Sequence, residues 1–298
     1  MVGNQANFSP AKFKEIAIPL FSKQLMSQIE ELTYLAFEYL ESSIRTYQTA
    51  ESFLNDLLNI QLKQFKSFNV KAKGQSYDIS NRLDAEYYLP KYDELFVTLR
   101  NFETKRLGDI VHINKSIEPG SAAYQDKGIP FIRVANLSKY GISDTDIFLS
   151  SEKYKEVIRP KRETILLSKD GSVGIAYKVE QDMDVITSGA ILHLIVIDKD
   201  FMPDYLTLVL NSSVVSMQAE RDAGGSIIQH WKPSEIENVI IPKLSPQIQQ
   251  EITDKVRESF MLRKKSLRLL ELAKTAVEVA IEQGEDKVME ILNKSKYI

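Results

Sequence analysis

Cysteine is absent from the 298-residue sequence. This absence excludes disulfides, thiolate nucleophiles and cysteine-ligated zinc, and it is typical of a protein that works in a reducing compartment. Long apolar runs are absent as well: no stretch of about 18 apolar residues occurs, and the first residues lack the charged and apolar regions of a signal peptide. We therefore expect a soluble cytoplasmic protein that does not enter a membrane.

Catalytic sequence motifs are also missing. Neither Gly-x-Gly-x-x-Gly nor Gly-x-x-x-x-Gly-Lys-Ser/Thr occurs, so dinucleotides and nucleoside triphosphates lack their usual phosphate cradles. His112, His193 and His230 stand singly, without metal-ligand spacing, and each is expected to be structural or at the surface. The Asn-Pro-Pro-Tyr and Asp-Pro-Pro-Tyr loops of amino-methylating enzymes do not occur either. These absences predict no catalytic residues, no metal and no cofactor.

A repeated segment is the strongest pattern that is present. A shift of 223 positions places Pro10–Ala50 on Pro233–Ala273 without a gap and matches ten identical residues. Among them, Ile18-Pro19 matches Ile241-Pro242. Each copy has a short apolar strand ending in Ile-Pro, then a Ser-x-Gln stretch suited to capping a helix, then a long helical pattern.

Small and apolar residues recur at steps of three and four along both copies. No proline or glycine interrupts residues 23–73 or 247–283, so each helix is predicted to exceed thirty residues and to measure about 50 Å. Either helix alone could be an ordinary core helix. The same seam of small residues in two copies favours an antiparallel coiled-coil pair. The seam residues are Ile29, Leu32, Ala36, Leu40, Ser43, Tyr47, Ala50, Leu54 and Leu57 in one copy, and Ile252, Val256, Ser259, Arg263, Ser266, Leu270, Ala273, Val277 and Ala280 in the other.

A different pattern lies between the helices, where short apolar runs alternate with turn residues. This pattern predicts a compact mixed domain, and the fold class is α/β (α+β) with two long antiparallel coiled-coil helices. A domain that starts where one helix ends and finishes where the next begins fits most easily at the shared tip of such a pair. The predicted strands are Ile129–Val134, Thr164–Leu167, Ile175–Val179 and Ala190–Ile197, and the predicted helices are Leu89–Phe102 and Tyr205–Gln218.

Basic and polar residues concentrate on the turns of this domain. Residues 100–180 contain 14 Lys and Arg against 11 Asp and Glu, although the whole chain has a net charge of -3. The loops Lys115–Lys127 and Ser168–Ser172 combine side chains suited to phosphates and base edges. A solvated surface of mixed charge explains the same residues. Arg263-Lys264-Lys265 likewise fits either a phosphate contact or a solvated helix face.

Five short motifs follow one another along the sequence: Ile129-Pro-Phe-Ile-Arg-Val-Ala-Asn136, Ile165-Leu-Leu-Ser-Lys-Asp-Gly-Ser-Val-Gly174, Ser188-Gly189-Ala190, Gly224-Gly225-Ser226-Ile227 and Val239-Ile-Ile-Pro-Lys-Leu-Ser-Pro-Gln247. In this order they resemble the specificity subunits of type I restriction-modification systems. The resemblance spans most of the chain. It implies a non-catalytic subunit with a target recognition domain, which reads one half of a bipartite DNA site. It also implies two spacer helices, which hold recognition domains apart and dock methyltransferase subunits that supply catalysis and cofactor.

One departure from the family pattern sets the expected domain organisation. Family members alternate two recognition domains with two spacer helices, whereas this sequence shows helix, recognition domain, helix. We expect either a second copy, which favours a palindromic interrupted site, or a split or truncated product. The predicted division is 1–22, the end of an upstream recognition module; 23–73, the first spacer helix; 75–245, the recognition domain; 246–283, the second spacer helix; and 284–298, a C-terminal tail.

The predicted function is sequence-specific binding of double-stranded DNA in the major groove by loops of residues 106–230. Expected partners are methyltransferase subunits, restriction subunits and a second copy or half-subunit. A coiled-coil scaffold whose globular tip binds protein is the alternative, and an independent nuclease is a third. The predicted DNA-binding residues are Lys115, Tyr124, Gln125, Lys127, Arg133, Asn136, Lys169 and Ser172.

Overall fold

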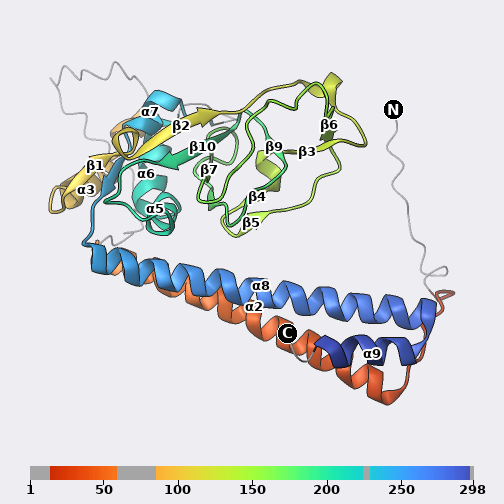
Figure 1. The fold of residues 1–298 in the computed structure, drawn as a ribbon. Coiled ribbons are helices and arrows are strands. Elements are labelled where there is room, and N and C mark those ends of the chain that lie inside the picture. The colour runs from red at the N-terminus through yellow and green to blue at the C-terminus, as the bar shows by residue number, and fades with distance from the viewer. Residues whose placement is uncertain (1–13, 59–84, 224–228, 296–298) are drawn as a thin grey trace, which may run out of the picture. The chain divides into compact units, whose positions relative to one another are not determined.

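The computed structural model describes residues 14–58, 85–223 and 229–295 (Figure 1). These residues belong to two compact units. The larger unit lies within residues 45–260, and the smaller one combines residues up to 44 with residues from 261 onwards. Each unit has a hydrophobic core of its own. No helix among the described residues is long and apolar enough to cross a membrane.

An antiparallel four-stranded sheet forms the centre of the larger unit, in the order β2-β10-β7-β8. Leu192 of β10 lies opposite Leu167 on one side and Lys115 on the other. Strand β7 is buried along its whole length, which is why its first three residues, Ile165–Leu167, are all apolar instead of alternating with polar ones. Helix α5 packs against β8, and α6 packs against α5. The bounds are β2 Val111–Lys115, β7 Ile165–Ser168, β8 Ala176–Lys178, β10 Ile191–Val196, α5 Pro203–Leu210 and α6 Ser213–Asp222.

Smaller sheets extend this domain. A three-stranded sheet has the order β6-β3-β9 with a parallel β3–β9 pair, β4 and β5 form a hairpin, and β1 pairs with β11. Trp231 is fully buried in the main core, and Phe131 is buried in a second core beneath β3. The strand bounds are β1 Thr104–Arg106, β3 Ile129–Ile132, β4 Leu137–Ser138, β5 Gly141–Ile142, β6 Phe148–Leu149, β9 Ile186–Thr187 and β11 Ile240–Pro242.

Short helices complete the domain. Proline stands at the start of α3, α5 and α7, where its fixed φ fits the helix and its missing N–H costs nothing. The helix bounds are α3 Pro90–Leu99, α4 Leu107–Ile110 and α7 Pro233–Glu237, with single 3-10 turns at η1 Ala85–Tyr88, η2 Ser121–Ala123 and η3 Val134–Asn136.

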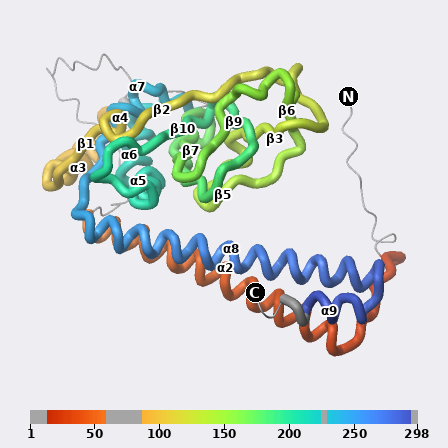
Figure 2. The backbone as a smooth tube through the Cα atoms, viewed as in Figure 1, coloured from red at the N-terminus to blue at the C-terminus, as the bar shows by residue number. Residues whose placement is uncertain are grey.

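The two long helices are α2 (Lys23–Leu57) and α8 (Pro246–Gln283). As the repeat predicts, each is preceded by a capping serine. The Ser22 hydroxyl accepts a hydrogen bond from the Leu25 N–H at 3.3 Å, and the Ser245 hydroxyl accepts one from the Ile248 N–H at 3.4 Å. In the smaller unit the start of α2 shares a core with the end of α8, and in the larger unit the end of α2 shares a core with the start of α8. The helices therefore run antiparallel, side by side in each unit (Figures 1 and 2).

The predicted seam is confirmed, because every one of its positions is buried or half-buried. Ala36, Ser43 and Ser266 are almost completely buried, which lets the helix backbones approach closely. At the other end of the seam, the Tyr47 ring meets Phe260 edge-on, with centroids 6.5 Å apart. The continuation of the first helix to residue 73 stays a prediction, since residues 59–84 lie outside the described ranges.

The region predicted as a C-terminal tail contains a further helix, α9 (Glu285–Ser295). Gly284, with a φ of 88°, separates it from α8 in a conformation that favours glycine. Val288 and Leu292 lie one turn apart and are buried in the same core as Leu25. This i, i+4 apolar pair explains the helix. The 1–22 segment has no helix or strand in its described residues, 14–22, so the strand predicted to end in Ile18-Pro19 is wrong. Its counterpart Ile241-Pro242 does lie in a strand, β11, where β1 is the pairing partner.

The four predicted strands and two predicted helical stretches of the domain are confirmed, with bounds shifted by a few residues. The last predicted helix is two helices, α5 and α6, because the chain turns at Asn211 and Ser212. The Asn211 amide accounts for the turn: it donates to the Ala176 carbonyl at 2.8 Å and accepts from the Ala176 N–H at 3.0 Å.

A buried ion network joins β8, α5 and α8 within the larger unit. The Asp204 carboxylate, 1% exposed, lies 3.0 Å from Lys178 Nζ and 2.9 Å from Arg257 Nε. Burial disfavours the charged form of Lys178, but Asp204 and Glu180 outweigh this and hold the pKa of the lysine above its ordinary value. The network fixes the first turns of α8 to the domain.

Candidate nucleic-acid interface

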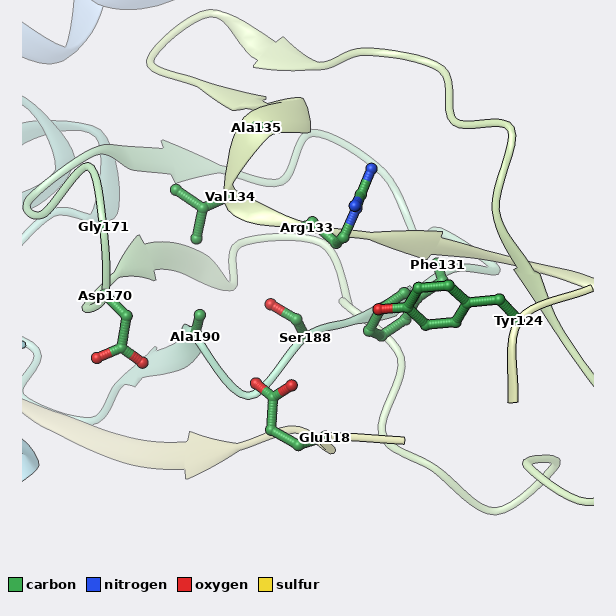
Figure 3. A pocket seen from close by; sticks show the side chains of 10 residues that line it. All are labelled: Glu118, Tyr124, Phe131, Arg133, Val134, Ala135, Asp170, Gly171, Ser188 and Ala190. Atoms are coloured by element: carbon green, nitrogen blue, oxygen red, sulfur yellow. The ribbon is translucent and has the colours of Figure 1, made fainter. Parts of the chain in front are cut away.

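A shallow pocket of about 360 Å³ opens where the loops of the larger unit converge (Figure 3). Its lining comes from the loop after β2, the end of β3, the turn after β7 and the segment after β9. Two of the predicted DNA-binding residues, Tyr124 and Arg133, line it. The other lining residues are Glu118, Phe131, Val134, Ala135, Asp170, Gly171, Ser188 and Ala190.

Backbone hydrogen bonds hold these segments together. The Ser188 N–H donates to the Ile132 carbonyl at 2.8 Å, and the Gly189 N–H donates to the Ile117 carbonyl at 2.8 Å. The Lys169 N–H donates to Ala190 at 2.9 Å. Four stretches that are distant in sequence are thereby tied into one rim, which is a rigid base for exposed side chains.

The turn after β7 has an internal frame. Its Ser168 hydroxyl donates to the Ser172 carbonyl at 2.6 Å and accepts from the Ile175 N–H at 2.9 Å. Gly171 has a φ of 74°, which a side chain would strain, and its N–H donates to the Gln229 carbonyl at 3.0 Å. Ser172 itself is exposed and contributes its carbonyl to this frame. The predicted residue therefore lies on a fixed turn.

The loop before β3 places three further predicted residues. Tyr124 is half-buried, with its ring 5.6 Å from the Phe131 ring, so its position is set by the core. Gln125 pairs through its backbone with Phe148, and its side chain is exposed. Lys127 is exposed as well. The loop thus offers an anchored ring beside two exposed polar side chains.

Arg133 and Asn136 differ in what they offer. Arg133 is exposed, and its guanidinium makes no ion pair with the described residues. The Asn136 side chain is used in hydrogen bonds within the loop. Its oxygen accepts from the Arg133 N–H at 3.1 Å, and its amide NH2 donates to the Asp144 carbonyl at 3.0 Å. The geometry makes Asn136 a support for the backbone that carries Arg133.

The two predicted lysines also differ. Lys115 is exposed at the end of β2 and lies beside Gly189. Lys169 is mostly buried and pairs with the adjacent Asp170 carboxylate. Asp170 also accepts from His230 Nδ1 at 2.9 Å. Burial favours the neutral form of Asp170, but the hydrogen bonds from Lys169 and His230 outweigh it and hold the pKa of the carboxyl below its ordinary value.

Glu118, Asp170, Ser188 and His230 are the residues of this region that sequence reasoning did not select. Three of them line the pocket, and His230 is joined to it through Asp170. Asp170 and Ser188 lie within two of the five motifs, Glu118 lies in the loop Lys115–Lys127, and His230 lies between the last two motifs. They were not selected because the sequence criteria favour cationic and amide side chains over acidic ones. Their positions around one pocket also depend on the folded structure, which the spacing of the residues in the sequence does not reveal.

The basic cluster of residues 153–162 is largely neutralised. Arg159 pairs with Asp184 at 3.0 Å, and Lys161 pairs with Asp182 at 3.0 Å. Arg162 and Lys155 each lie within 4 Å of a neighbouring glutamate. This pattern fits a solvated surface of mixed charge better than a phosphate-binding patch.

The three histidines have different surroundings. His112 is exposed, His230 is mostly exposed, and His193 is 1% exposed, with Nε2 2.7 Å from the Thr187 hydroxyl. Burial lowers the pKa of His193 to about 4. Among the described residues no three His, Asp or Glu side chains gather as a metal site would require.

Solved structures similar to this chain include an HsdS subunit and an S subunit. One is the HsdS subunit from Thermoanaerobacter tengcongensis, with 14% identity, a TM-score of 0.42, and coverage of 88% of this chain and 57% of that one. The other is the type I restriction-modification system S subunit from M. genitalium, with 14% identity, a TM-score of 0.42, and coverage of 96% and 65%. This chain spans less than two thirds of the length of either. No curated protein matches it.

The sequence profile of one protein family covers the domain just described. It is the type I restriction modification DNA specificity domain, and it matches residues 100–260. The matched range contains the whole four-stranded sheet, the pocket and the first turns of α8. With more than half of its length matched in this way, the chain belongs to the family of type I restriction modification DNA specificity domains.

Proposed function

We propose that the chain is a DNA sequence-recognition subunit whose reading face is this pocket and its surrounding loops. The observation that carries the proposal is the lining itself: one rigid domain brings Tyr124, Arg133 and Glu118 to the same pocket. The Tyr124 ring is anchored on Phe131, and the exposed Arg133 and Glu118 side chains form no ion pair with the described residues. Base edges in the major groove present the donors and acceptors that such groups recognise. Family membership supports the same conclusion.

The remaining predicted residues divide into two roles in this proposal. Lys115, Gln125, Lys127 and Ser172 are exposed around the pocket, where they suit contacts to phosphate and sugar. Asn136 and Lys169 hold other groups in place through the hydrogen bond to Arg133 and the ion pair to Asp170. Phosphate contacts supply affinity, and base contacts supply the choice of sequence.

We further propose that the subunit is non-catalytic and acts in the cytoplasm within a type I restriction-modification complex. The recognition domain, residues 75–245, reads one half of a bipartite site. The spacer helices, 23–73 and 246–283, dock the methyltransferase subunits, which bring catalysis and cofactor, and restriction subunits join the same complex. Exposed apolar side chains on the helices, among them Tyr34, Met261 and Leu267, support a docking role.

The repeat supports a second recognition module beside the first copy. In the second copy, Ile241 is buried in the β1–β11 pair, and Phe260 packs on Tyr47 and Tyr177 of the larger unit. The equivalent residues of the first copy, Ile18 and Phe37, are 80% and 53% exposed. A surface that holds a recognition domain in one copy is thus uncovered in the other.

We propose that a second copy of this chain, or a separate half-subunit, provides the module that covers this surface. Two copies related by a twofold axis would present two identical reading faces. The expected target is then an interrupted palindrome. A different half-subunit would instead give two unlike half-sites.

Selection of duplexes from a random DNA pool by the full chain tests the proposed function. We expect one enriched sequence, with affinity that falls steeply as salt rises because phosphate contacts release counterions. Arg133→Ala should relax one base position, whereas Lys127→Ala should weaken binding to all sequences alike. Lys161→Ala is the matched control, since that lysine pairs with Asp182. Salt-insensitive behaviour without an enriched sequence would instead favour a scaffold with a protein-binding tip.

A further inference from the structure

Glu118 is an exposed carboxylate at the edge of the pocket. It forms no hydrogen bond or ion pair within the described part of the chain, in contrast to the other carboxylate of the pocket. Asp170 is held between Lys169 and His230. The Lys115 side chain also lies beside Gly189 but makes no ion pair with Glu118, so the described residues leave the Glu118 oxygens available as acceptors.

The position of Glu118 is restricted although its carboxylate is unpaired. Its side chain lies over Gly189, where an added Cβ would be 2.9 Å from Glu118 Oε1. The backbone just before Glu118 is tied down, since the Gly189 N–H donates to the carbonyl of Ile117 at 2.8 Å. Figure 3 shows the carboxylate directed toward Ser188, across the pocket from Arg133. A partly fixed carboxylate loses less entropy when it binds.

An unpaired carboxylate on a DNA-reading face is unfavourable unless it meets a hydrogen-bond donor, because phosphates and base acceptors repel it. The major groove offers two donor groups: the amino groups of cytosine and adenine. The adenine amino group stands beside the N7 acceptor, which repels a second carboxylate oxygen. The cytosine amino group has no acceptor beside it on its own base.

We propose that Glu118 is a specificity-determining residue that accepts a hydrogen bond from the amino group of a cytosine in the recognised half-site. The inference rests on the proposed function and adds to it the class of base that one side chain reads. Arg133, on the other side of the pocket, supplies the opposite chemistry, that of a donor suited to guanine acceptors. The pocket as a whole is then suited to a half-site that contains a G·C pair.

The test compares the full wild-type chain with Glu118→Gln and Glu152→Gln in the same random-pool selection. Both variants lose one negative charge from an exposed glutamate, so any general gain in affinity is common to them. For Glu118→Gln we expect the preference for cytosine at one position to fall by about 5- to 150-fold. Adenine should gain there, because an amide can both donate and accept. Glu152→Gln should keep the wild-type consensus.

Glu118→Ala is a second variant, which should lose the preference for cytosine without acquiring a preference for adenine. Thermal melting checks that each variant is folded. A clear wild-type consensus that Glu118→Gln and Glu118→Ala leave unchanged would overturn the role of Glu118 and leave the proposed function intact. A wild-type consensus with no invariant cytosine would likewise overturn the role of Glu118 without contradicting the proposed function. If the wild-type chain enriches no sequence, the proposed function fails, and the role of Glu118 fails with it.

Discussion

His193 shows how one buried side chain makes the stability of the domain depend on pH. The imidazole is 1% exposed, and among the described residues its side-chain hydrogen-bond partner is the Thr187 hydroxyl. Its Nδ1 has no hydrogen-bond partner in the described structure. A protonated ring would therefore carry a buried charge without compensation, which is the reason for its low pKa.

We expect the free energy of unfolding to fall as the pH drops from about 6.5 to about 4. The unfolded histidine takes up a proton near pH 6.5, whereas the folded one does so at about 4. Because the unfolded state binds more protons in this window, folding loses stability there, by about 3 kcal/mol in total. Urea titrations at several pH values measure the loss.

His193→Gln is the matched variant for that experiment, since glutamine can still pair with Thr187 but does not titrate. Its unfolding free energy should lack this component of the pH dependence between 6.5 and 4. An unchanged pH profile in the variant would show that other groups cause the loss. Asp170 contributes at lower pH, because its depressed pKa gives stability that is lost as the pH falls through the folded value.

Single residues also show why the site was only partly predictable. Residue type and loop position were enough to select Tyr124 and Arg133, which line the pocket. Asn136 has the same sequence signal, but its amide is used inside the loop. Glu118 was not selected, because charge counting favours cations in a DNA-binding loop. Whether a polar side chain is free or committed depends on tertiary contacts that no local pattern encodes.

At the scale of elements, the helical seam was predictable because small and apolar residues recur at steps of three and four, and this spacing occurs in both copies of the repeat. The small residues of the seam are the informative ones. Ser266 is 1% exposed, and its hydroxyl has no hydrogen-bond partner in the described structure. The small size of Ser266 suits the close packing of the helices, while its unsatisfied hydroxyl lowers the stability of the folded state.

We expect Ser266→Ala to raise the unfolding free energy by about 1 kcal/mol, because it removes the unsatisfied hydroxyl and improves helix propensity. Ser266→Leu should lower it by about 1 to 3 kcal/mol, since the seam has no room for three more carbon atoms. Thermal and urea unfolding of both variants measures these changes. A tolerated leucine would mean that the helices are not closely packed at this point.

The elements that were missed lack such a period. Helix α9 follows a glycine and has a short apolar pattern, and its burial depends on Leu25 at the other end of the chain. The β1–β11 pair joins Lys105 to Ile241, residues far apart in sequence. Pairings of this kind are set by the assembled fold, so single strands were predictable and their partners were not.

At the scale of the whole molecule, the two copies of the repeat have the same sequence pattern in different surroundings. Phe37 and Phe260 are equivalent and identical, but Phe260 packs against Tyr177 of the recognition domain, whereas Phe37 is 53% exposed. An internal repeat keeps the apolar residues of an interface in both copies. The exposed copy is therefore the natural place to look for assembly.

We expect Phe37→Glu to reduce self-association of the full chain, as sedimentation equilibrium measures it, with little change in the melting temperature, because Phe37 is 53% exposed. Phe260→Glu is the matched variant. It places a charge between the Tyr47 and Tyr177 rings and should lower the melting temperature markedly. A wild-type chain that stays monomeric at high concentration would exclude the second copy, leaving a separate half-subunit as the partner. A Phe37→Glu chain that associates as strongly as the wild type would show that the exposed repeat surface is not the interface between copies.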